Sequence, residues 1–419
     1  LKLREKVLMF VISRSTMVVA EESAGVRRGP RGAGALSLEY LATATLRVRF
    51  PQLDDKPAFD LDGTPRVVIV GAGFGGMGSA IQLNRLGYDK IAILDREDDL
   101  GGTWHVNRYP GLTVDVPSTT YSYRFEPNPY WSRLYAPGSE LKTYAEHVAD
   151  KYDLRRYMRF NTVVDGARWD DDAQEWLVSL SDGQTLHTRF LILATGYLCQ
   201  PKKPDIPGIE SFAGTVLHAQ EWDHSYSLAG KRAAIIGTGS TGVQLIPKLA
   251  EDASELTVYQ RTPIWVMPKL DFGFGPRAQR LFAKVPATQR MLRVSSDLFM
   301  DIMVTLAMWR FRQFRPVNRI AAAIGRLHRF AAIRDRELRR KLTPDYRAGC
   351  KRILNSDTYY RGIADPKTEV ITDRIARFTP TGIVTADTDT TFLDQKTLGL
   401  RKLDSLASRI SWNVIREAV

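Results

Sequence analysis

Residues 67–76, which read Val-Val-Ile-Val-Gly-Ala-Gly-Phe-Gly-Gly, decide the fold class of this 419-residue chain. The four β-branched apolar residues predict a buried strand, and the Gly-x-Gly-x-x-Gly spacing that follows predicts a tight turn that opens a helix. The helical pattern ends at Gly87, and Ile91 to Leu94 predict the next strand. In such a turn the first glycine allows the bend, the second lets backbone N–H groups approach a pyrophosphate, and the third permits close packing.

The same order of elements occurs a second time at residues 233–259, where the turn at 237–242 reads Gly-Thr-Gly-Ser-Thr-Gly. The two units differ in charge at the end of their second strand. Asp95 follows the last glycine of the first turn by nineteen residues, and Arg261 follows that of the second turn by nineteen. An acid there accepts hydrogen bonds from a ribose 2′-hydroxyl, whereas a base suits a 2′-phosphate. The sequence therefore predicts FAD at the first turn and NADPH at the second, with Thr262 adding a hydroxyl contact. A solvated Arg261 and glycine turns without a ligand stay open as alternatives.

The composition excludes several classes of protein. Hydrophobic residues make up 44% of the chain and aromatic residues 10%, which fills real cores and excludes a disordered or fibrous chain. The two cysteines, Cys199 and Cys350, exclude a disulfide scaffold and a zinc module and predict a reducing, cytoplasmic location. The six histidines show no metal-binding spacing, so no metal is expected.

The net charge of +12 is concentrated in one segment. Residues 276–341 hold 16 Lys and Arg against 4 Asp and Glu, with apolar residues between the arginines. This pattern predicts a basic helical insertion, either packed on its domain with a solvated face or resting as a peripheral contact on an anionic membrane. No apolar run is long enough for a membrane-spanning helix, and no nucleic-acid partner is expected.

Two further regions have distinct patterns. Residues 1–62 begin with basic residues around a short apolar run and continue into a Gly/Arg-rich stretch, which predicts a poorly ordered leader. Residues 161–193 alternate as an antiparallel meander with Asp182-Gly183 as a hairpin turn, and Phe190 to Ala194 predict a buried strand.

The segment between the two glycine turns carries a family fingerprint. Phe212 to Asp223 read Phe-Ala-Gly-Thr-Val-Leu-His-Ala-Gln-Glu-Trp-Asp. The chain resembles the class B flavoprotein monooxygenases of the Baeyer–Villiger type, whose FxGxxxHxxxW(D/P) fingerprint it matches at every fixed position. Related N- and S-oxygenating enzymes usually carry Tyr or Phe where Trp222 stands, and the resemblance gives His218 a largely structural role. Supporting stretches are Gly101–Trp104, Asn107–Gly111 with Asp115, Ala194–Gly196, Gln260–Thr262 and Gly349–Arg352.

The resemblance implies an activity and its catalytic residues. NADPH reduces FAD, O₂ then forms a peroxyflavin, and this nucleophile inserts oxygen into a small-molecule ketone to give an ester or lactone. Arg352 is implied to be catalytic, because a permanently charged guanidinium suits a developing oxyanion, and Asp115 is implied to pair with it and orient it. Lys351 is implied to help hold NADPH. Oxygenation of nitrogen or sulfur, and an inactive dinucleotide-binding remnant, stay open as alternatives.

The predicted fold is α/β, with two Rossmann-like dinucleotide-binding domains, an antiparallel β-meander and a helical insertion, the NADP domain being inserted in the FAD domain. The expected boundaries are 63–210 for the first part of the FAD domain, 211–228 for the fingerprint linker, 229–345 for the NADP domain, and 346–387 for the return to the FAD domain. Residues 388–419 lack the further strand and second ATG-like turn of relatives, and we expect a truncated or diverged tail.

The residues expected to bind the cofactors lie in the glycine turns, at the strand ends and in the motifs quoted above. They are Gly71, Gly73, Phe74, Gly76, Asp95, Arg96, Gly102, Thr103, Trp104, Asp115, Tyr121, Val164, Ala194, Thr195, Gly237, Thr238, Gly239, Ser240, Thr241, Gly242, Arg261, Thr262 and Lys351.

Overall fold

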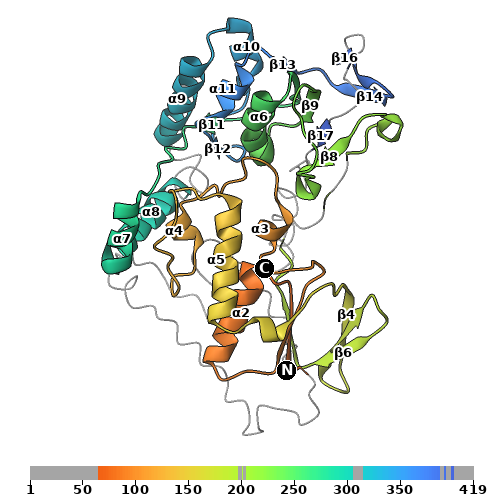
Figure 1. Ribbon diagram of the computed structural model, residues 1–419, viewed down its shortest axis with the longest axis vertical. Helices are drawn as coiled ribbons and strands as arrows, with labels where there is room; N and C mark the ends of the chain where they lie inside the picture. Colours follow the sequence, from red (N-terminus) through yellow and green to blue (C-terminus); the bar gives the residue numbers. More distant parts are fainter. Residues whose placement is uncertain are drawn as a thin grey trace, which may run out of the picture. The chain divides into compact units, whose positions relative to one another are not determined.

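The computed structural model describes residues 65–196, 201, 204–304, 315–386, 391–392 and 398–400 (Figure 1). The expected leader at 1–62 and most of the tail from 388 onward lie outside the described residues. The chain divides into two compact units. The first unit holds the residues up to Asp99 together with Tyr152–Thr195, and the second holds Leu100–Lys151 together with the residues from Gly196 onward.

A four-stranded parallel sheet with the order β3-β2-β1-β7 forms the centre of the first unit. β1 (Val67–Val70) and β2 (Ile91–Leu94) are the strands predicted around the first glycine turn, and helix α2 (Phe74–Arg85) begins directly after that turn. β7 (Phe190–Leu193) pairs with β1, and β3 (Met158–Arg159) pairs with β2. Because the strands are parallel, their carboxyl ends share one edge of the sheet, and the glycine turn lies there.

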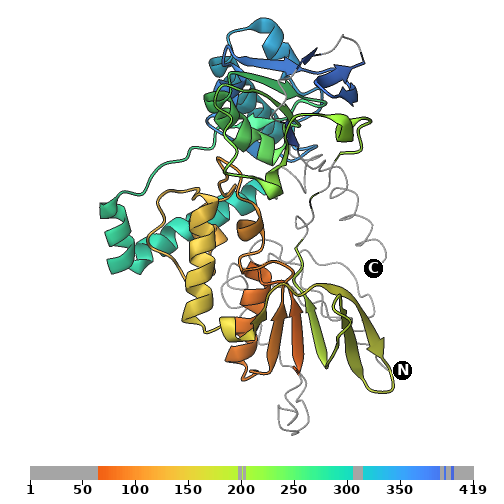
Figure 2. The ribbon, with the colours of Figure 1, turned by 45° about the vertical axis from the view of Figure 1, so that its right-hand side comes forward.

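The antiparallel meander expected from the sequence covers part of this sheet. It consists of β4 (Val164–Asp170), β5 (Glu175–Leu180) and β6 (Thr185–Thr188) (Figure 2). At the end of β5 the buried Val178 and Leu180 flank the exposed Ser179, and the two buried side chains join a cluster with residues of the parallel strands. This cluster comprises Val68, Ala92, Leu94, Val178, Leu180 and Leu191.

The second unit is built on a five-stranded parallel sheet with the order β13-β10-β9-β17-β8. β9 (Arg232–Ile236), α6 (Ser240–Asp252) and β10 (Glu255–Tyr259) are the strand, helix and strand predicted around the second glycine turn. β8 (Val216–His218) comes from the fingerprint segment, and β17 (Leu398–Leu400) comes from the tail. Both predicted Rossmann-like units are therefore present, and the α/β fold class is confirmed.

The position of β13 (Thr368–Ile371) differs from the expected domain boundary. Residues 346–387 are expected to return to the FAD domain, but β13 is the edge strand beside β10 in the sheet of the second glycine turn. The physical reason is packing. Val370 is buried in the core of this sheet, and α11 (Tyr359–Ile363) packs on α6, where Gly362 lies close to Pro247. This segment therefore extends the second nucleotide-binding unit.

The tail also departs from its expected character. Residues 388–419 are expected to lack a further strand, yet β17 pairs in parallel with both β8 and β9, and β16 (Thr391–Phe392) pairs with β15 (Gly382–Thr385). The facing edges of β8 and β9 carry backbone N–H and C=O groups that need hydrogen-bond partners. The short uncharged strand β17 lies between them and provides these partners to both strands. The described part of the tail therefore contributes two short strands, and its truncated or diverged character stays a prediction.

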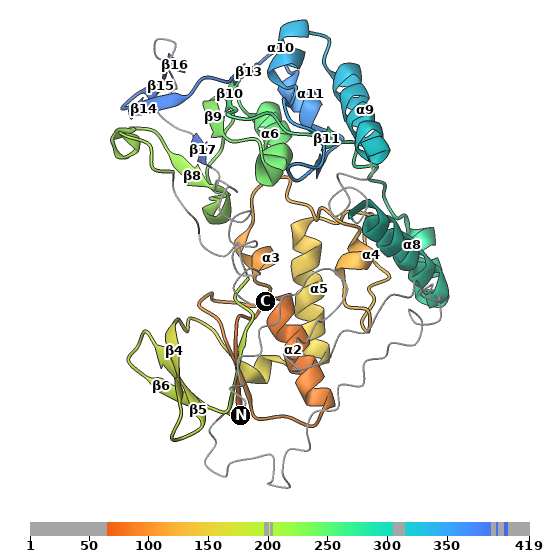
Figure 3. The ribbon, with the colours of Figure 1, turned by 180° about the vertical axis from the view of Figure 1, so that it is seen from behind.

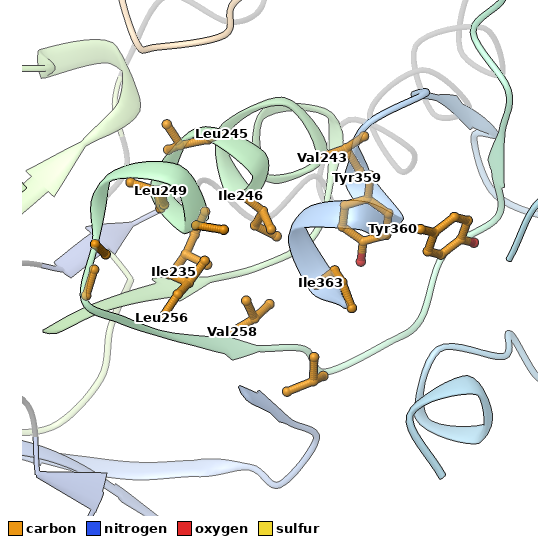
Figure 4. Close-up of a cluster of buried hydrophobic side chains, with 14 of the residues drawn as sticks. Ile235, Val243, Leu245, Ile246, Leu249, Leu256, Val258, Tyr359, Tyr360 and Ile363 are labelled. Carbon is orange, nitrogen blue, oxygen red and sulfur yellow. The ribbon is translucent and has the colours of Figure 1, made fainter. Parts of the chain in front are cut away.

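One hydrophobic cluster joins α6 and α11 to the second sheet (Figure 4). Side chains of β9 and β10 face the buried side of α6, and tyrosines of α11 close the cluster at its side. Burial of this kind contributes about 25 cal/mol per Å² of apolar surface, so it fixes the helix that begins at the second glycine turn. The residues labelled in Figure 4 are Ile235, Val243, Leu245, Ile246, Leu249, Leu256, Val258, Tyr359, Tyr360 and Ile363.

Residues 100–151 belong to the second compact unit as α3 (Thr103–Val106), α4 (Ser118–Tyr121) and α5 (Gly138–Lys151). Their expected place in the FAD domain at 63–210 stays a prediction. The cause is a set of contacts with that unit, including the packing of α4 on α8 (Pro286–Val304).

Four helices occupy the expected insertion at 276–341, within the described part of the chain (Figure 3). They are α7 (Pro276–Lys284), α8, α9 (Arg315–Ala332) and α10 (Arg336–Lys341). Among the residues that the structure describes, none of the helices combines the length and the apolar character needed to cross a bilayer. The remaining short elements are β11 (Val266–Met267), β12 (Leu354–Asn355), β14 (Ile375–Thr379) and the 3₁₀ turns Arg155–Tyr157, Ile209–Ser211 and Ala219–Glu221.

Candidate functional site

The first glycine turn has no room for a side chain at its first and last glycines. Gly71 has a left-handed φ of +111°, and a Cβ there would lie 2.4 Å from the carbonyl oxygen of Ala194. A Cβ on Gly76 would lie 1.9 Å from the carbonyl oxygen of Gly71. Helix α2 starts at Phe74 after Gly73, and no side chain caps its N-terminus. The residue at the N-cap is therefore a glycine without a capping side chain, as is usual in an anion-binding turn.

The second glycine turn repeats this geometry. Gly237 has a φ of +101°, and a Cβ on Gly242 would lie 2.5 Å from the carbonyl oxygen of Gly237. Helix α6 starts at Ser240 after Gly239, and again no side chain caps it. Thr238 is buried within the turn, and Thr241 follows in the first turn of the helix. Both turns thus have the backbone shape that fits a dinucleotide pyrophosphate.

The acidic strand end of the first unit is tied to its glycine turn. The Asp95 carboxylate accepts hydrogen bonds from the N–H of Ala72 at 2.6 Å and from the N–H of Glu97 at 3.0 Å. Arg96 forms an ion pair with Glu97 at 2.9 Å. The first of these bonds places the carboxylate beside the glycine turn, at the position where a ribose hydroxyl is bound in this type of unit.

The basic strand end of the second unit has a different setting. Gln260 is buried, and its backbone N–H donates to the carbonyl oxygen of Ile371 at 2.8 Å. Its side-chain amide donates to the carbonyl oxygen of Lys341 at 3.0 Å. Arg261 follows on the surface and forms no ion pair with any residue in the described part of the chain, and Thr262 beside it is half-buried. The guanidinium is therefore available to a ligand.

Trp104 and Tyr121 lie together in the second unit. The indole N–H of Trp104 donates to the Tyr121 hydroxyl at 3.1 Å, and the two rings meet edge to face with centroids 5.2 Å apart. Gly102, with a φ of +54°, precedes the short helix that begins at Thr103. Because each ring contacts the other, the pair also has an ordinary packing role.

Three further expected residues lie in the first unit. Val164 is the first residue of β4 and is half-buried. The N–H of Ala194 donates to the carbonyl of Val70 at 2.8 Å, which extends β7 by one residue. Thr195 then follows close to Gly71, since its backbone nitrogen would lie 3.4 Å from a Cβ at that glycine.

The two residues expected to be catalytic form an ion pair in the second unit. Arg352 donates from Nη2 to Oδ2 of Asp115, although 237 positions separate them in the chain. Their side chains are 55% and 42% exposed, so the pair is accessible to a ligand. The neighbouring Lys351 is exposed, and its ammonium lies 4.6 Å from the ring centre of Tyr346.

The loop that carries Asp115 is anchored to helix α6 by Gln244. The Gln244 amide donates to the carbonyl of Thr113 at 2.9 Å, and its oxygen accepts from the Tyr109 hydroxyl at 2.9 Å. Gly111 has a φ of +79°, and a Cβ there would lie 2.7 Å from the carbonyl oxygen of Gln244. The loop therefore rests on the helix that begins at the second glycine turn.

Sequence reasoning did not identify Gln244 or a second contact residue, Lys269. The Lys269 ammonium donates to the hydroxyl of Thr113, two residues before Asp115. No motif marks either residue. Gln244 reads as an ordinary helical position and Lys269 as a surface lysine, and only the long-range docking of the 109–115 loop gives them their contacts.

The expected residues therefore fall into two groups. The first unit holds Gly71, Gly73, Phe74, Gly76, Asp95, Arg96, Val164, Ala194 and Thr195. The second unit holds Gly102, Thr103, Trp104, Asp115, Tyr121, the turn from Gly237 to Gly242, Arg261, Thr262, Lys351 and Arg352.

Comparison with known proteins agrees with this architecture. The family model described as pyridine nucleotide-disulphide oxidoreductase matches residues 68–291. A Baeyer-Villiger monooxygenase of Streptomyces coelicolor is 41% identical over 322 residues, which are 77% of this chain and 61% of that protein. One of Pseudomonas aeruginosa is 38% identical over 319 residues, which are 76% of this chain and 60% of that protein. The chain thus spans about three fifths of the length of these curated relatives.

The chain is also similar to solved structures of monooxygenases. An oxidized steroid monooxygenase bound to NADP matches with a TM-score of 0.71 and 30% identity, covering 80% of this chain and 70% of that one. Cyclohexanone monooxygenase in its closed form matches with a TM-score of 0.70 and 30% identity, with the same two coverages.

Proposed function

Since this chain belongs to the pyridine nucleotide-disulphide oxidoreductase family and to the Baeyer-Villiger monooxygenases, we propose that it is an FAD- and NADPH-dependent monooxygenase acting on a small-molecule ketone. The reaction would insert one atom of O₂ beside the carbonyl and give an ester or lactone. The observation that carries the proposal is the Arg352–Asp115 ion pair, since it stands in the same unit as a glycine turn suited to NADPH.

The two glycine turns support the cofactor assignment. The space around Gly76 and Gly242 is closed to a Cβ, and each following helix has a glycine at its N-cap, so both turns suit a pyrophosphate. Asp95 suits the ribose of FAD at the first turn, and Arg261 suits the 2′-phosphate of NADPH at the second. When bound, the reduced flavin supplies the electrons that activate O₂.

The residues of this chain then have separate tasks. Arg352 would hold a guanidinium cation next to the oxygen atom where negative charge develops. Asp115 would fix the direction of that guanidinium, and Gln244 would fix the loop that carries Asp115. Lys351 and Arg261 would hold NADPH through its charged groups.

The direct test is anaerobic addition of NADPH to the purified protein. A yellow protein whose flavin absorbance bleaches with NADPH, recovers in air and yields an ester from a ketone would meet the proposal. Bleaching with oxidation of an amine or sulfide in place of a ketone would identify the heteroatom reaction. Recovery in air without any oxygenated product would identify a dinucleotide-binding protein that does not oxygenate.

We predict that Arg261→Ala raises the KM for NADPH by about 10-fold or more and leaves the KM for NADH nearly unchanged. Loss of one charge-assisted contact to a phosphate costs about 1.5–3 kcal/mol, and NADH lacks the 2′-phosphate. Steady-state reduction of the flavin with each nucleotide measures this. Arg277→Ala, which removes another exposed arginine, is the matched control. Equal effects on the two nucleotides would contradict the phosphate role.

We further propose that the helical insertion makes a peripheral contact with an anionic membrane on the reducing, cytoplasmic side. Four apolar side chains of α9, Ile320, Ile324, Leu327 and Phe330, follow helical spacing and are 60%, 45%, 68% and 64% exposed. The exposed Arg319 and Arg326 lie in the same helix. An apolar row with arginines beside it suits a lipid surface, from which an apolar ketone could also enter.

Co-sedimentation with vesicles tests this contact. We expect binding to vesicles rich in phosphatidylglycerol, weakening as salt is raised, and little binding to phosphatidylcholine alone. The variant Leu327→Asp should lower the bound fraction several-fold. Leu86→Asp changes an equally apolar surface residue of the first unit and should have no effect. Unchanged binding in the Leu327 variant would refute the contact.

A further inference from the structure

Lys269 is a partly buried lysine for which the proposed chemistry has no use. It follows β11 by two residues, donates to the Thr113 hydroxyl and lies 4.8 Å from the ring centre of Tyr135. Thr113 stands two residues before Asp115. The ammonium therefore holds the side chain of the same loop residue, Thr113, whose backbone is bound by Gln244.

The same lysine is tied to the chain segment that carries Arg352. The Asp357 carboxylate accepts hydrogen bonds from the backbone N–H groups of Lys269 at 2.7 Å, Leu270 at 3.4 Å and Asp271 at 3.3 Å. Asp357 lies five residues after Arg352. Lys269 thus joins the two segments whose side chains form the Asp115–Arg352 pair.

The surroundings of the ammonium are rich in carboxylates. Asp115, Asp271 and Asp357 favour its charged form, while Arg133, which pairs with Asp271 at 2.9 Å, opposes it. Burial lowers the pKa of Lys269 from 10.5 to about 8, and the carboxylates limit that fall. Tyr135 shares the cluster, and burial followed by the same three carboxylates raises the pKa of its hydroxyl.

We propose that Lys269 is a positioning residue for the Asp115–Arg352 pair, holding the Thr113 end of the loop and supplying the cation that balances three carboxylates around it. Asp115 then remains directed at Arg352 and is not drawn toward other groups. The inference deepens the proposed function and rests on it. Its consequence is that the oxygenating half of the reaction needs a charged Lys269, whereas reduction of the flavin does not.

The pH profile of the holoenzyme tests this consequence. In the natural protein we expect product formation to fall with an apparent pKa of about 8, while flavin reduction by NADPH at the same pH does not fall. Lys269→Met should lower product formation by about 10- to 100-fold below pH 8, as expected for a mispositioned catalytic group, and its difference from the natural protein should shrink above pH 8. Lys269→Arg keeps a cation and should restore most of the rate and remove the fall above pH 8.

Two controls separate charge from packing. Thr113→Val removes the hydrogen bond and keeps the ammonium, so it should lower the rate by less than Lys269→Met does. Lys284→Met removes an exposed lysine of α7 and should match the natural protein in every measurement. The proposal would be overturned if Lys269→Met kept the natural dependence of product formation on pH. It would also be overturned if flavin reduction fell with pH in parallel with product formation.

Thermal unfolding gives a readout that needs no turnover. The folded state holds the Lys269 proton less tightly than the unfolded chain, so stability should rise as pH increases from about 8 to 10.5. Lys269→Met should lose this rise, and Asp115→Asn should move its onset to lower pH because one favourable carboxylate is gone. If the two substitutions act independently in the double variant, Lys269 and Asp115 are not coupled and the proposal fails. A natural protein that NADPH does not reduce would instead refute the proposed function, and the unfolding result would still decide the role of Lys269.

Discussion

Replacing Arg352 by alanine is expected to lower formation of oxygenated product by about 100- to 1000-fold while NADPH still bleaches the bound flavin. Removal of one preorganised donor at a developing oxyanion typically has this cost. The alanine would also leave Asp115 without the partner that it has in the structure. The measurement is product analysis by chromatography together with anaerobic flavin reduction on the same preparation.

Two comparisons make the result specific. Arg361→Ala removes an exposed arginine of α11 in the same part of the chain and should leave both half-reactions intact. Asp115→Asn keeps Arg352 charged but weakens its orientation, so it should retain more product formation than Arg352→Ala. Normal product formation by Arg352→Ala would remove this residue from the catalytic assignment.

The elements around the glycine turns could be predicted because their signals are local. β1, β2, β9 and β10 are short apolar runs, and the left-handed φ of Gly71 and Gly237 is a property that glycine alone adopts without strain. The pairing of Arg352 with Asp115 is not local. Only the resemblance to a family predicts it, because no periodicity joins residues 237 positions apart.

Other features depend on tertiary packing that no local pattern contains. β13 reads as an ordinary short strand, and only the packing of α11 on α6 places it beside β10. β17 is a three-residue segment whose own sequence does not predict a strand, and it becomes one by pairing with β8 and β9. Lys269 likewise reads as a surface lysine. Its contacts come from residues far away in the chain, since its ammonium donates to Thr113 and its backbone N–H donates to Asp357.

Gly76→Ala is expected to abolish retention of FAD. Its Cβ would lie 1.9 Å from the carbonyl oxygen of Gly71, and neither backbone atom can move without opening the turn at the end of β1. Overpacking of this kind destabilises a fold by about 1–3 kcal/mol or more, and here it distorts the glycine turn that would bind the pyrophosphate. The ratio of flavin absorbance to protein absorbance after purification measures the loss. Gly166→Ala, in the same unit and with no atom within 4 Å of its Cβ, should retain FAD.

Gly242→Ala tests whether the two turns serve different cofactors. Its Cβ would lie 2.5 Å from the carbonyl oxygen of Gly237, so the second turn should open while the first remains intact. We expect a yellow protein that retains FAD but is no longer bleached by NADPH, although dithionite still reduces it. Gly275→Ala, whose Cβ would meet no neighbour, is the matched control in this unit. Loss of FAD from Gly242→Ala with normal retention in Gly76→Ala would reverse the assignment of the two turns, because each substitution closes only the cradle in which it lies.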